Sequence, residues 1–191
     1  MAILTTRTVA DFIGVDEAEN MTPLARLRDA AQKRAEAFCG YAFDFGTHTE
    51  YYDALPNNGG IVYTKHRPIV ALFALTDSAQ DGPRAINTNN DVHWDYDDYK
   101  ASGRVELWNT ESDFVAGRRA ILVSYSAGWT TANAPADLVQ ALCEIIAAKW
   151  EGTEALSRSA QNVDGVQITW RAEDIPPQAF ATLCAYKHWL P

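Results

Sequence analysis

The segment RAILVSYSAGWTTANAPADLVQALCEIIAAKWEG, Arg119–Gly152, decides the fold, because it changes from a strand pattern to a helix pattern. Ile121–Tyr125 is apolar or β-branched except at Ser124, which predicts a buried strand. Gly128 ends this strand, since glycine adopts backbone angles that Tyr or Val cannot. The segment therefore predicts a strand, a turn and a polar loop, followed by a helix.

That helix is predicted over Pro135–Gly152. Proline fits the first helical turn, where its missing N–H removes no bond, and Asp137 puts negative charge near the positive end of the helix dipole. An apolar stripe recurs at helical spacing: Leu138, Leu142, Ile145, Ile146 and Trp150. Such a helix requires an apolar partner from elsewhere in the chain.

Two helices are predicted upstream. Thr8–Ile13 forms a short helix that Thr8 caps and Gly14 ends, and residues 16–20 form an acidic connector. Thr22 and Pro23 start a second helix, which runs to about Phe38 and stops at Gly40. Its apolar face consists of Leu24, Leu27, Ala31, Ala35 and Phe38.

The opposite face of this second helix carries the densest basic cluster in the chain: Arg26, Arg28, Lys33 and Arg34. Two interpretations stay open. The cluster is either a solvated helix face or an interface that meets an acidic neighbour, which would be a second copy of the chain or a partner protein.

Residues 43–125 have mostly strand character. Thr47–Tyr52 and Ile61–Thr64 are rich in β-forming residues, and the turn Pro56–Gly60 between them predicts a hairpin. Thr76–Asn90 is predicted to be a loop. Three further strands are predicted at Ile69–Leu75, Arg104–Trp108 and Ile121–Tyr125.

The segment DVHWDYDDY, Asp91–Tyr99, allows two interpretations. If it is extended, Asp91, His93, Asp95 and Asp97 share one face. Carboxylates beside an imidazole can bind a metal or transfer protons. The segment has neither H-x-x-x-H nor E-x-x-H spacing, which favours an amphipathic strand with a solvated acidic face.

The C-terminal part begins with a polar segment, residues 151–165, predicted to be a loop. Val166–Trp170 is predicted to be a short strand or an extended arm, and a last helix is predicted over Pro177–Trp189. Its apolar residues either pack on the chain's own core or dock onto a partner. Together these patterns predict an α+β fold: a four-helix bundle-like core with a small, mostly antiparallel β-sheet inserted between the second and third helices.

Composition argues against several classes of protein. The 191 residues carry a net charge of −9, which argues against a sequence-independent nucleic-acid binder with a basic face. The odd number of cysteines, Cys39, Cys143 and Cys184, fits free thiols in a reducing cytosol. The sequence shows no pattern of a signal peptide and no apolar run of the ~20 residues that span a bilayer.

Several of these segments resemble the head-to-tail connector (adaptor, head-completion) proteins of tailed double-stranded DNA phages. The resemblance rests first on a strand, loop and helix motif, matched here by Val123, Tyr125, Ala127, Gly128, Trp129, Pro135, Leu138, Ala141, Trp150 and Glu151. The order of short helix, acidic linker and Ala-rich helix ending at Phe38–Tyr41 is similar to the family, as is Tyr99–Val105. The last helix matches at Ile175, Pro176, Ala179, Leu183 and Tyr186, with Lys187 where the family has Arg.

The resemblance implies a single connector domain, residues 1–191, helical in 1–42 and 127–191 with a β-rich insertion at 43–126. It implies a structural protein of the virion neck, assembled in the host cytoplasm, with no catalysis, cofactor or membrane contact. About twelve copies would form a ring under the portal protein and continue the DNA channel without sequence-specific contacts. The ring would also meet the next neck or tail component, a stopper or tail terminator.

Two sets of residues are candidates for these contacts. The candidate subunit interface is Arg26, Arg28, Lys33 and Arg34 with Asp95 and Asp97. The candidate portal-docking residues are Phe180, Leu183, Tyr186, Lys187 and Trp189. Two alternatives stay open: another neck or tail-completion protein, and a small enzyme with a metal or acid–base site at His93, Asp95 and Asp97.

Overall fold

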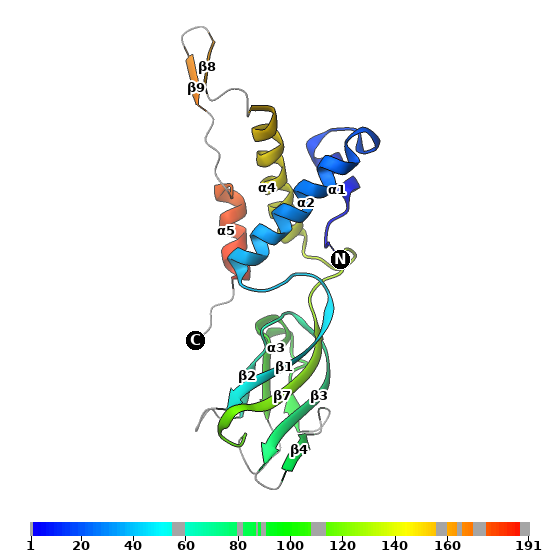
Figure 1. The fold of residues 1–191 in the computed structure, drawn as a ribbon, viewed down its shortest axis with the longest axis vertical. Coiled ribbons are helices and arrows are strands. Elements are labelled where there is room, and N and C mark those ends of the chain that lie inside the picture. Colours follow the sequence, from blue (N-terminus) through cyan, green and yellow to red (C-terminus); the bar gives the residue numbers. More distant parts are fainter. Residues whose placement is uncertain are drawn as a thin grey trace. The chain divides into compact units, whose positions relative to one another are not determined.

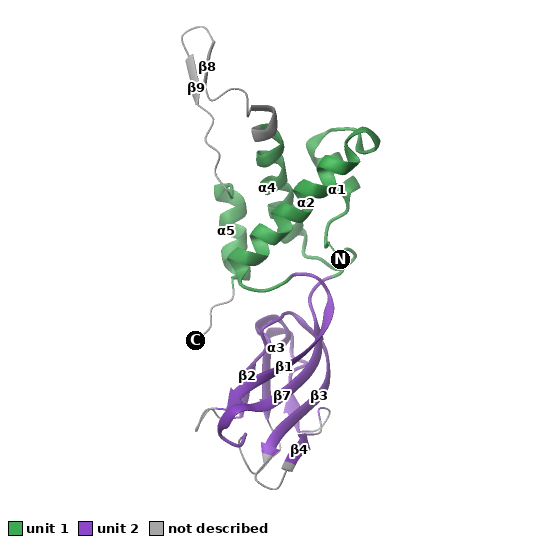
Figure 2. Ribbon diagram, viewed as in Figure 1, with its two compact units in different colours: residues 1–42, 130–191 green, residues 43–129 purple. Residues whose placement is uncertain are grey.

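The computed structural model describes residues 2–54, 60–79, 82–86, 88, 91–107, 114–155, 160–163, 166–169 and 175–187. The chain forms two compact units (Figure 2). One unit comprises Met1–Ala42 and Thr130–Pro191, and the other comprises Phe43–Trp129. The first is mostly helical and the second mostly β, so the predicted α+β fold is confirmed.

The helical unit contains α1, Thr6–Ile13, α2, Glu17–Cys39, α4, Ala136–Ala155, and α5, Pro177–Tyr186 (Figure 1). α1, α2 and α5 all pack against α4. Leu138, Leu142, Ile145 and Ile146 of α4 are fully buried, as the apolar stripe predicts, whereas Trp150 is only partly buried. The helices that pack on α4 also have fully buried residues: Val9 in α1, Leu24, Ala31 and Ala35 in α2, and Leu183 in α5.

Two predicted helix starts are wrong. Thr5, not Thr8, caps α1, because the Thr5 side chain accepts a hydrogen bond from the Thr8 N–H. α2 begins at Glu17, where Asp16 caps it by accepting from the Ala18 N–H at 2.8 Å. The predicted acidic connector is thus the first turn of α2, where Glu17 and Glu19 favour the helix dipole, and Pro23 lies inside the helix.

Among its described residues, the β-rich unit contains two sheets and one helix (Figure 1). The larger sheet has the order β1-β7-β3-β4, formed by Gly46–Ala54, Gly117–Ala127, Ile69–Ala79 and Gly82–Ile86. The smaller has the order β2-β6-β5, formed by Ile61–Tyr63, Arg104–Leu107 and Val92–His93. All pairings in both sheets are antiparallel, and residues of both sheets belong to one apolar core.

The predicted hairpin between the first two strands is wrong. β1 pairs with β7, where Glu50 faces Val123, and β2 pairs with β6, where Val62 faces Val105. Most of the predicted turn, residues 56–59, lies outside the described residues. The predicted loop at Thr76–Asn90 is also wrong in part, because β3 extends to Ala79 and β4 follows it.

The acidic segment does not form one continuous strand. Its strand, β5, contains only Val92 and His93, and α3 begins at Asp97 and runs to Ser102. Asp97 and Asp98 occupy the first turn of α3, where negative charge is favourable. The prediction that Asp91, His93, Asp95 and Asp97 line one face of a single strand is therefore wrong.

The remaining differences lie after α4. This helix continues to Ala155, and the predicted polar loop contains β8, Ala160–Val163. β8 pairs with β9, Val166–Thr169, which confirms a strand in the predicted Val166–Trp170 segment. Trp108 and Trp170, predicted as strand ends, and Trp189 lie outside the described residues. No helix in the described ranges is long and apolar enough to span a membrane.

The entry and exit of the β-rich unit are bonded to each other. Asp44 and Trp129 form a parallel bridge, in which the Trp129 N–H donates to the Phe43 carbonyl at 2.8 Å. Gly128 has φ of 99° and lies so close to this strand that an added Cβ would come within 2.4 Å of the Asp44 carbonyl oxygen. A glycine is therefore required at the point where the chain leaves the unit.

Candidate interaction surfaces and a partly buried polar cluster

The predicted basic residues of α2 differ in their contacts within the helical unit. Arg28 is half-buried and its guanidinium lies 2.7 Å from the Asp29 carboxylate. The Lys33 Nζ lies 2.7 Å from Glu36, whose other oxygen accepts from the buried Gln32 side chain at 2.9 Å. Arg26 and Arg34 are exposed on the same helix, so both stay candidates for contact with a partner.

The acidic candidates lie in the β-rich unit, where Asp95 and Asp97 are exposed beside aromatic rings. The Tyr96 ring, half exposed, lies 5.2 Å from the His93 ring and 5.3 Å from the Tyr99 ring. We call Asp95, Tyr96 and Asp97 the acidic patch. Its chemistry suits a cationic partner, since both carboxylates and aromatic faces attract Arg and Lys.

Among the described residues, no group of three or more His, Cys, Asp or Glu side chains could hold a metal ion. His93 lies in β5 and Asp97 in α3, so they belong to different elements and do not line one strand face. The site proposed from spacing alone, His93 with Asp95 and Asp97, therefore has no geometric support among these residues.

The portal-docking candidates on α5 fall into two groups. Leu183 is fully buried, and the Tyr186 hydroxyl donates to the Asp137 carboxylate at 2.6 Å, so both residues hold α5 against the helical unit. Phe180 is 47% exposed with its ring 5.1 Å from that of Phe38, and the Lys187 Nζ lies 5.3 Å from the same Phe38 ring. Phe180 and Lys187 therefore offer an accessible surface with Phe38.

A partly buried polar cluster in the β-rich unit was not predicted. We call it the Glu50 cluster; it consists of His48, Glu50 and Tyr52 from β1, Tyr125 from β7, and His66 from the bend before β3. Both tyrosine hydroxyls donate to Glu50 Oε2, with Tyr125 at 2.8 Å. His66 Nε2 lies 3.6 Å from Glu50 Oε1, and the rings of His48 and His66 stack at 3.8 Å and 8°.

Burial and hydrogen bonding shift the titration of this cluster. Burial lowers the pKa of His48 below its ordinary 6.5, although the Glu50 charge opposes this. Burial raises the pKa of Glu50, but hydrogen bonds from Tyr52 and Tyr125 and the nearby histidines outweigh it, so that the pKa falls below 4.5. Burial, with the Glu50 hydrogen bond, raises the pKa of Tyr52, and burial raises that of Tyr125. The cluster therefore favours a charged Glu50 and neutral phenols.

One sequence signal could have revealed the cluster. Alternate residues of a strand share a face, so His48, Glu50 and Tyr52 lie together along β1, whose burial alternates accordingly. The partners His66 and Tyr125 come from segments far away in sequence. No local spacing indicates that these partners meet β1.

No family model matches the chain, and no curated protein matches it by sequence. Its fold is similar to that of chains in several solved structures, among them three of gene transfer agent particles. A chain in the neck of an empty gene transfer agent (GTA) particle, computed with C6 symmetry, has a TM-score of 0.60 and 17% identity, covering 99% of this chain and 91% of that one. A chain from the virion of a native GTA particle has a TM-score of 0.61 and 18% identity over the same shares.

The third structure is the neck of a native GTA particle computed with C12 symmetry. Its matching chain has a TM-score of 0.57 and 17% identity, over 92% of this chain and 89% of that chain. At these identities the likeness shows the fold. This chain thus shares its fold, over nearly its whole length, with chains of particle necks.

Proposed function

We propose that this chain is a structural protein of the neck of a tailed-phage-like particle. The observation that carries the proposal is the shared fold over 99% of this chain and 91% of a chain from a GTA particle neck. The order of motifs in the sequence supports the same function independently of the fold. In this proposal the chain performs no catalysis.

The proposed assembly is a ring of about twelve copies under the portal protein, which joins the DNA-filled head to the tail. A ring requires a heterologous interface, in which one face of a subunit meets a different face of its neighbour. The basic Arg26 and Arg34 on α2 and the acidic patch are two such faces with opposite charge. The net charge of −9 suits a channel wall along which double-stranded DNA passes without adhering.

The proposed portal contact uses the C-terminal helix. Phe180 and Lys187 are its accessible members, whereas the buried Leu183 and the bond from Tyr186 to Asp137 position α5 on the helical unit. Assembly in the host cytoplasm and contact with a stopper or tail terminator on the opposite side complete the proposal.

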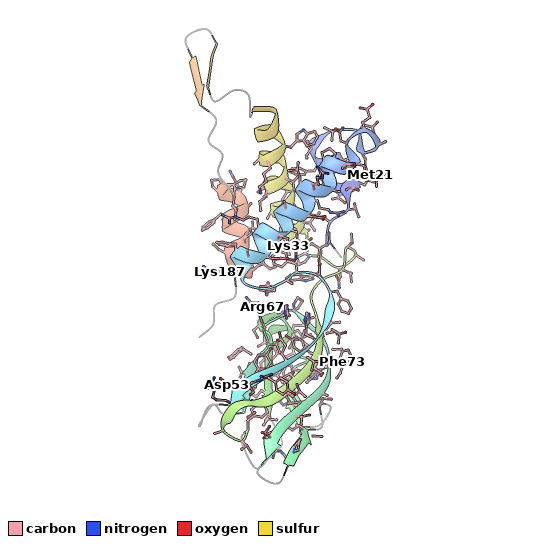
Figure 3. All side chains as sticks on the ribbon, in the orientation of Figure 1. Met21, Lys33, Asp53, Arg67, Phe73 and Lys187 are labelled. Carbon is pink, nitrogen blue, oxygen red and sulfur yellow. The ribbon has the colours of Figure 1, made fainter. Side chains whose placement is uncertain are left out.

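Co-sedimentation tests the portal contact. The purified chain is mixed with portal rings from the same genome, and bound protein is measured after centrifugation. We expect binding by the native chain, and its loss in a Phe180→Asp, Lys187→Glu variant. The control is Phe73→Asp, which replaces a side chain 55% exposed on β3 of the other unit (Figure 3). Equal binding by the docking variant and the control would contradict the portal contact.

A further inference from the structure

The bend at residues 64–67 joins the two sheets of the β-rich unit, because β2 precedes it and β3 follows it. On one side, the Thr64 N–H donates to the Gly103 carbonyl at 2.7 Å, next to β6 of the smaller sheet. On the other side, the Lys65 N–H donates to the Tyr52 hydroxyl at 2.9 Å and the His66 N–H to the Tyr125 hydroxyl at 3.1 Å. The bend is therefore bonded to both sheets.

The bonds to the larger sheet depend on Glu50. Each tyrosine hydroxyl donates a hydrogen bond to Glu50 Oε2, and its oxygen accepts a hydrogen bond from a backbone N–H of the bend. A charged carboxylate accepts such bonds more strongly than a neutral acid. Loss of the Glu50 charge would thus weaken two orienting bonds at once and release both N–H groups of the bend.

We propose that the Glu50 cluster is a proton-sensitive clasp, which holds the 64–67 bend against the larger sheet near neutral pH and releases it in acid. The clasp is a property of the β-rich unit and is independent of the neck function proposed above. It would allow the join between the two sheets to loosen without unfolding of the helical unit.

The stacked histidines make the clasp sensitive to protons. A proton on His66 faces the Glu50 carboxylate at 3.6 Å, so one positive charge has a counter-charge. A second proton, on His48, would put two cations in rings stacked at 3.8 Å. Besides Glu50, the His48 ring lies 5.5 Å from the Tyr125 ring of β7. The Tyr52 hydroxyl of β1 accepts from the Lys65 N–H, and Lys65 and Arg67 flank His66 in the bend. Figure 3 marks Arg67.

The sign of the effect follows from the two shifted groups. The pKa of His48 is lowered by folding, so its stabilising effect is complete above the unfolded value of 6.5 and is lost as pH falls below it. The pKa of Glu50 is also lowered, so its contribution is lost as pH falls below 4.5. Protonation of either group therefore opens the clasp as pH falls, His48 first and Glu50 at lower pH.

Hydrogen exchange of the full chain, read by mass spectrometry and corrected for intrinsic rates, tests this proposal. From one pH unit above the ordinary histidine value of 6.5 to about one and a half below it, we expect protection of the 64–67 amides to fall about tenfold. Protection of residues 138–146 in α4 serves as the internal reference and should hold. Constant protection of the bend over this range would overturn the proposal.

Three variants separate the clasp from general acid sensitivity. His48→Phe keeps an aromatic ring but cannot be protonated. The loss of protection of its 64–67 amides in acid should therefore be at most half of that in the native chain. His93→Phe, the same substitution outside the cluster, should behave as the native chain. Glu50→Gln should expose the bend already at neutral pH and flatten its pH dependence. A native-like pH response in both His48→Phe and Glu50→Gln would overturn the clasp. If His48→Phe does not fold, the response of Glu50→Gln alone decides the question.

Discussion

At the scale of single residues, the β-rich unit depends on side chains that combine a buried body with a polar end. Tyr125 is the clearest of these residues. It is fully buried between β1 and β3, yet its hydroxyl donates to Glu50 and accepts from the His66 N–H. Tyrosine suits this position because its ring fills the core while the hydroxyl satisfies two polar groups.

Tyr125→Phe is predicted to destabilise the chain by about 1–3 kcal/mol, because Glu50 and the His66 N–H each lose a partner inside the protein. Urea unfolding followed by fluorescence measures this loss. Tyr51→Phe is the matched control, since Tyr51 is exposed on the opposite face of β1, and its effect should stay within about 0.5 kcal/mol. Equal effects of the two substitutions would contradict the role of the Tyr125 hydroxyl.

Gly128→Ala is predicted to be more damaging than Gly14→Ala. Both glycines have positive φ, so each alanine carries a backbone cost of about 1–2 kcal/mol. Gly14 has open space around an added Cβ, whereas at Gly128 the Cβ would clash with the Asp44 backbone and disturb the bridge to Trp129. Thermal unfolding of both variants measures the difference, and similar losses would show that the close approach is unimportant.

At the scale of elements, α4 determines the packing of the helical unit, since α1, α2 and α5 all contact it. Leu142→Ala should leave a cavity and cost about 2–5 kcal/mol, because Leu142 is fully buried. Gln140→Ala on the exposed face of the same helix should change stability by less than about 0.5 kcal/mol. Chemical unfolding compares the two variants; a loss below ~1 kcal/mol for Leu142→Ala would contradict the assignment of this core.

The attachment of α5 should weaken at high pH. Burial and the hydrogen bond to Asp137 raise the pKa of Tyr186 above its ordinary value of 10.0. The contribution of the neutral Tyr186 hydroxyl to the stability of the folded chain is therefore complete below pH 10.0 and is lost as pH rises above it. Hydrogen exchange of α5 peptides, corrected for intrinsic rates, should show this loss in the native chain. Tyr186→Phe should reduce the pH dependence; an unchanged dependence would point to another group.

The sequence predicted elements with strong local patterns and failed where distant partners decide. The stripe from Leu138 to Ile146 and the strand at Ile121–Tyr125 were predicted correctly because each carries its own periodicity. The predicted hairpin was wrong because a turn signal at Pro56–Gly60 does not reveal that β1 pairs with β7. Paired residues such as Glu50 and Val123 are about seventy positions apart in the sequence. α3 was missed because DVHWDYDDY alternates like a strand.

For the candidate sites too, the sequence predicted local features but not contacts between distant segments. Arg26 and Asp97 were predicted as exposed charges and are exposed. The engagement of Lys33 by Glu36 could have been anticipated from the i, i+3 spacing, but the burial of Glu36 on Gln32 depends on the packed unit. The Glu50 cluster combines β1, β7 and the 64–67 bend, so only the folded β-rich unit brings it together.

At the scale of the whole molecule, the proposed ring must form between copies that each carry a net charge of −9. Like-charged copies repel, so their contact requires local charge complementarity. Arg26 and Arg34 on one copy and the acidic patch on the next would supply it. Added salt should weaken ring assembly on the portal, since it screens exposed charges.

Arg26→Glu with Arg34→Glu should reduce ring assembly on portal rings at least about tenfold, because two attractive contacts become repulsive. Quantitative negative-stain imaging of portal complexes measures the fraction that carry a ring. Arg7→Glu is the control, since Arg7 is an exposed cation of α1 paired only loosely with Asp11 at 4.0 Å. Intact assembly in the double variant would contradict the proposed subunit interface.

The neck function itself is tested most directly by electron cryo-microscopy of the native chain mixed with portal rings from the same genome. The account predicts one additional ring layer of about twelve copies on the portal, with the helical unit and the β-rich unit both visible in each copy. Portal rings that remain bare, although hydrogen exchange shows α4 of the added chain to be protected and the chain folded, would contradict it.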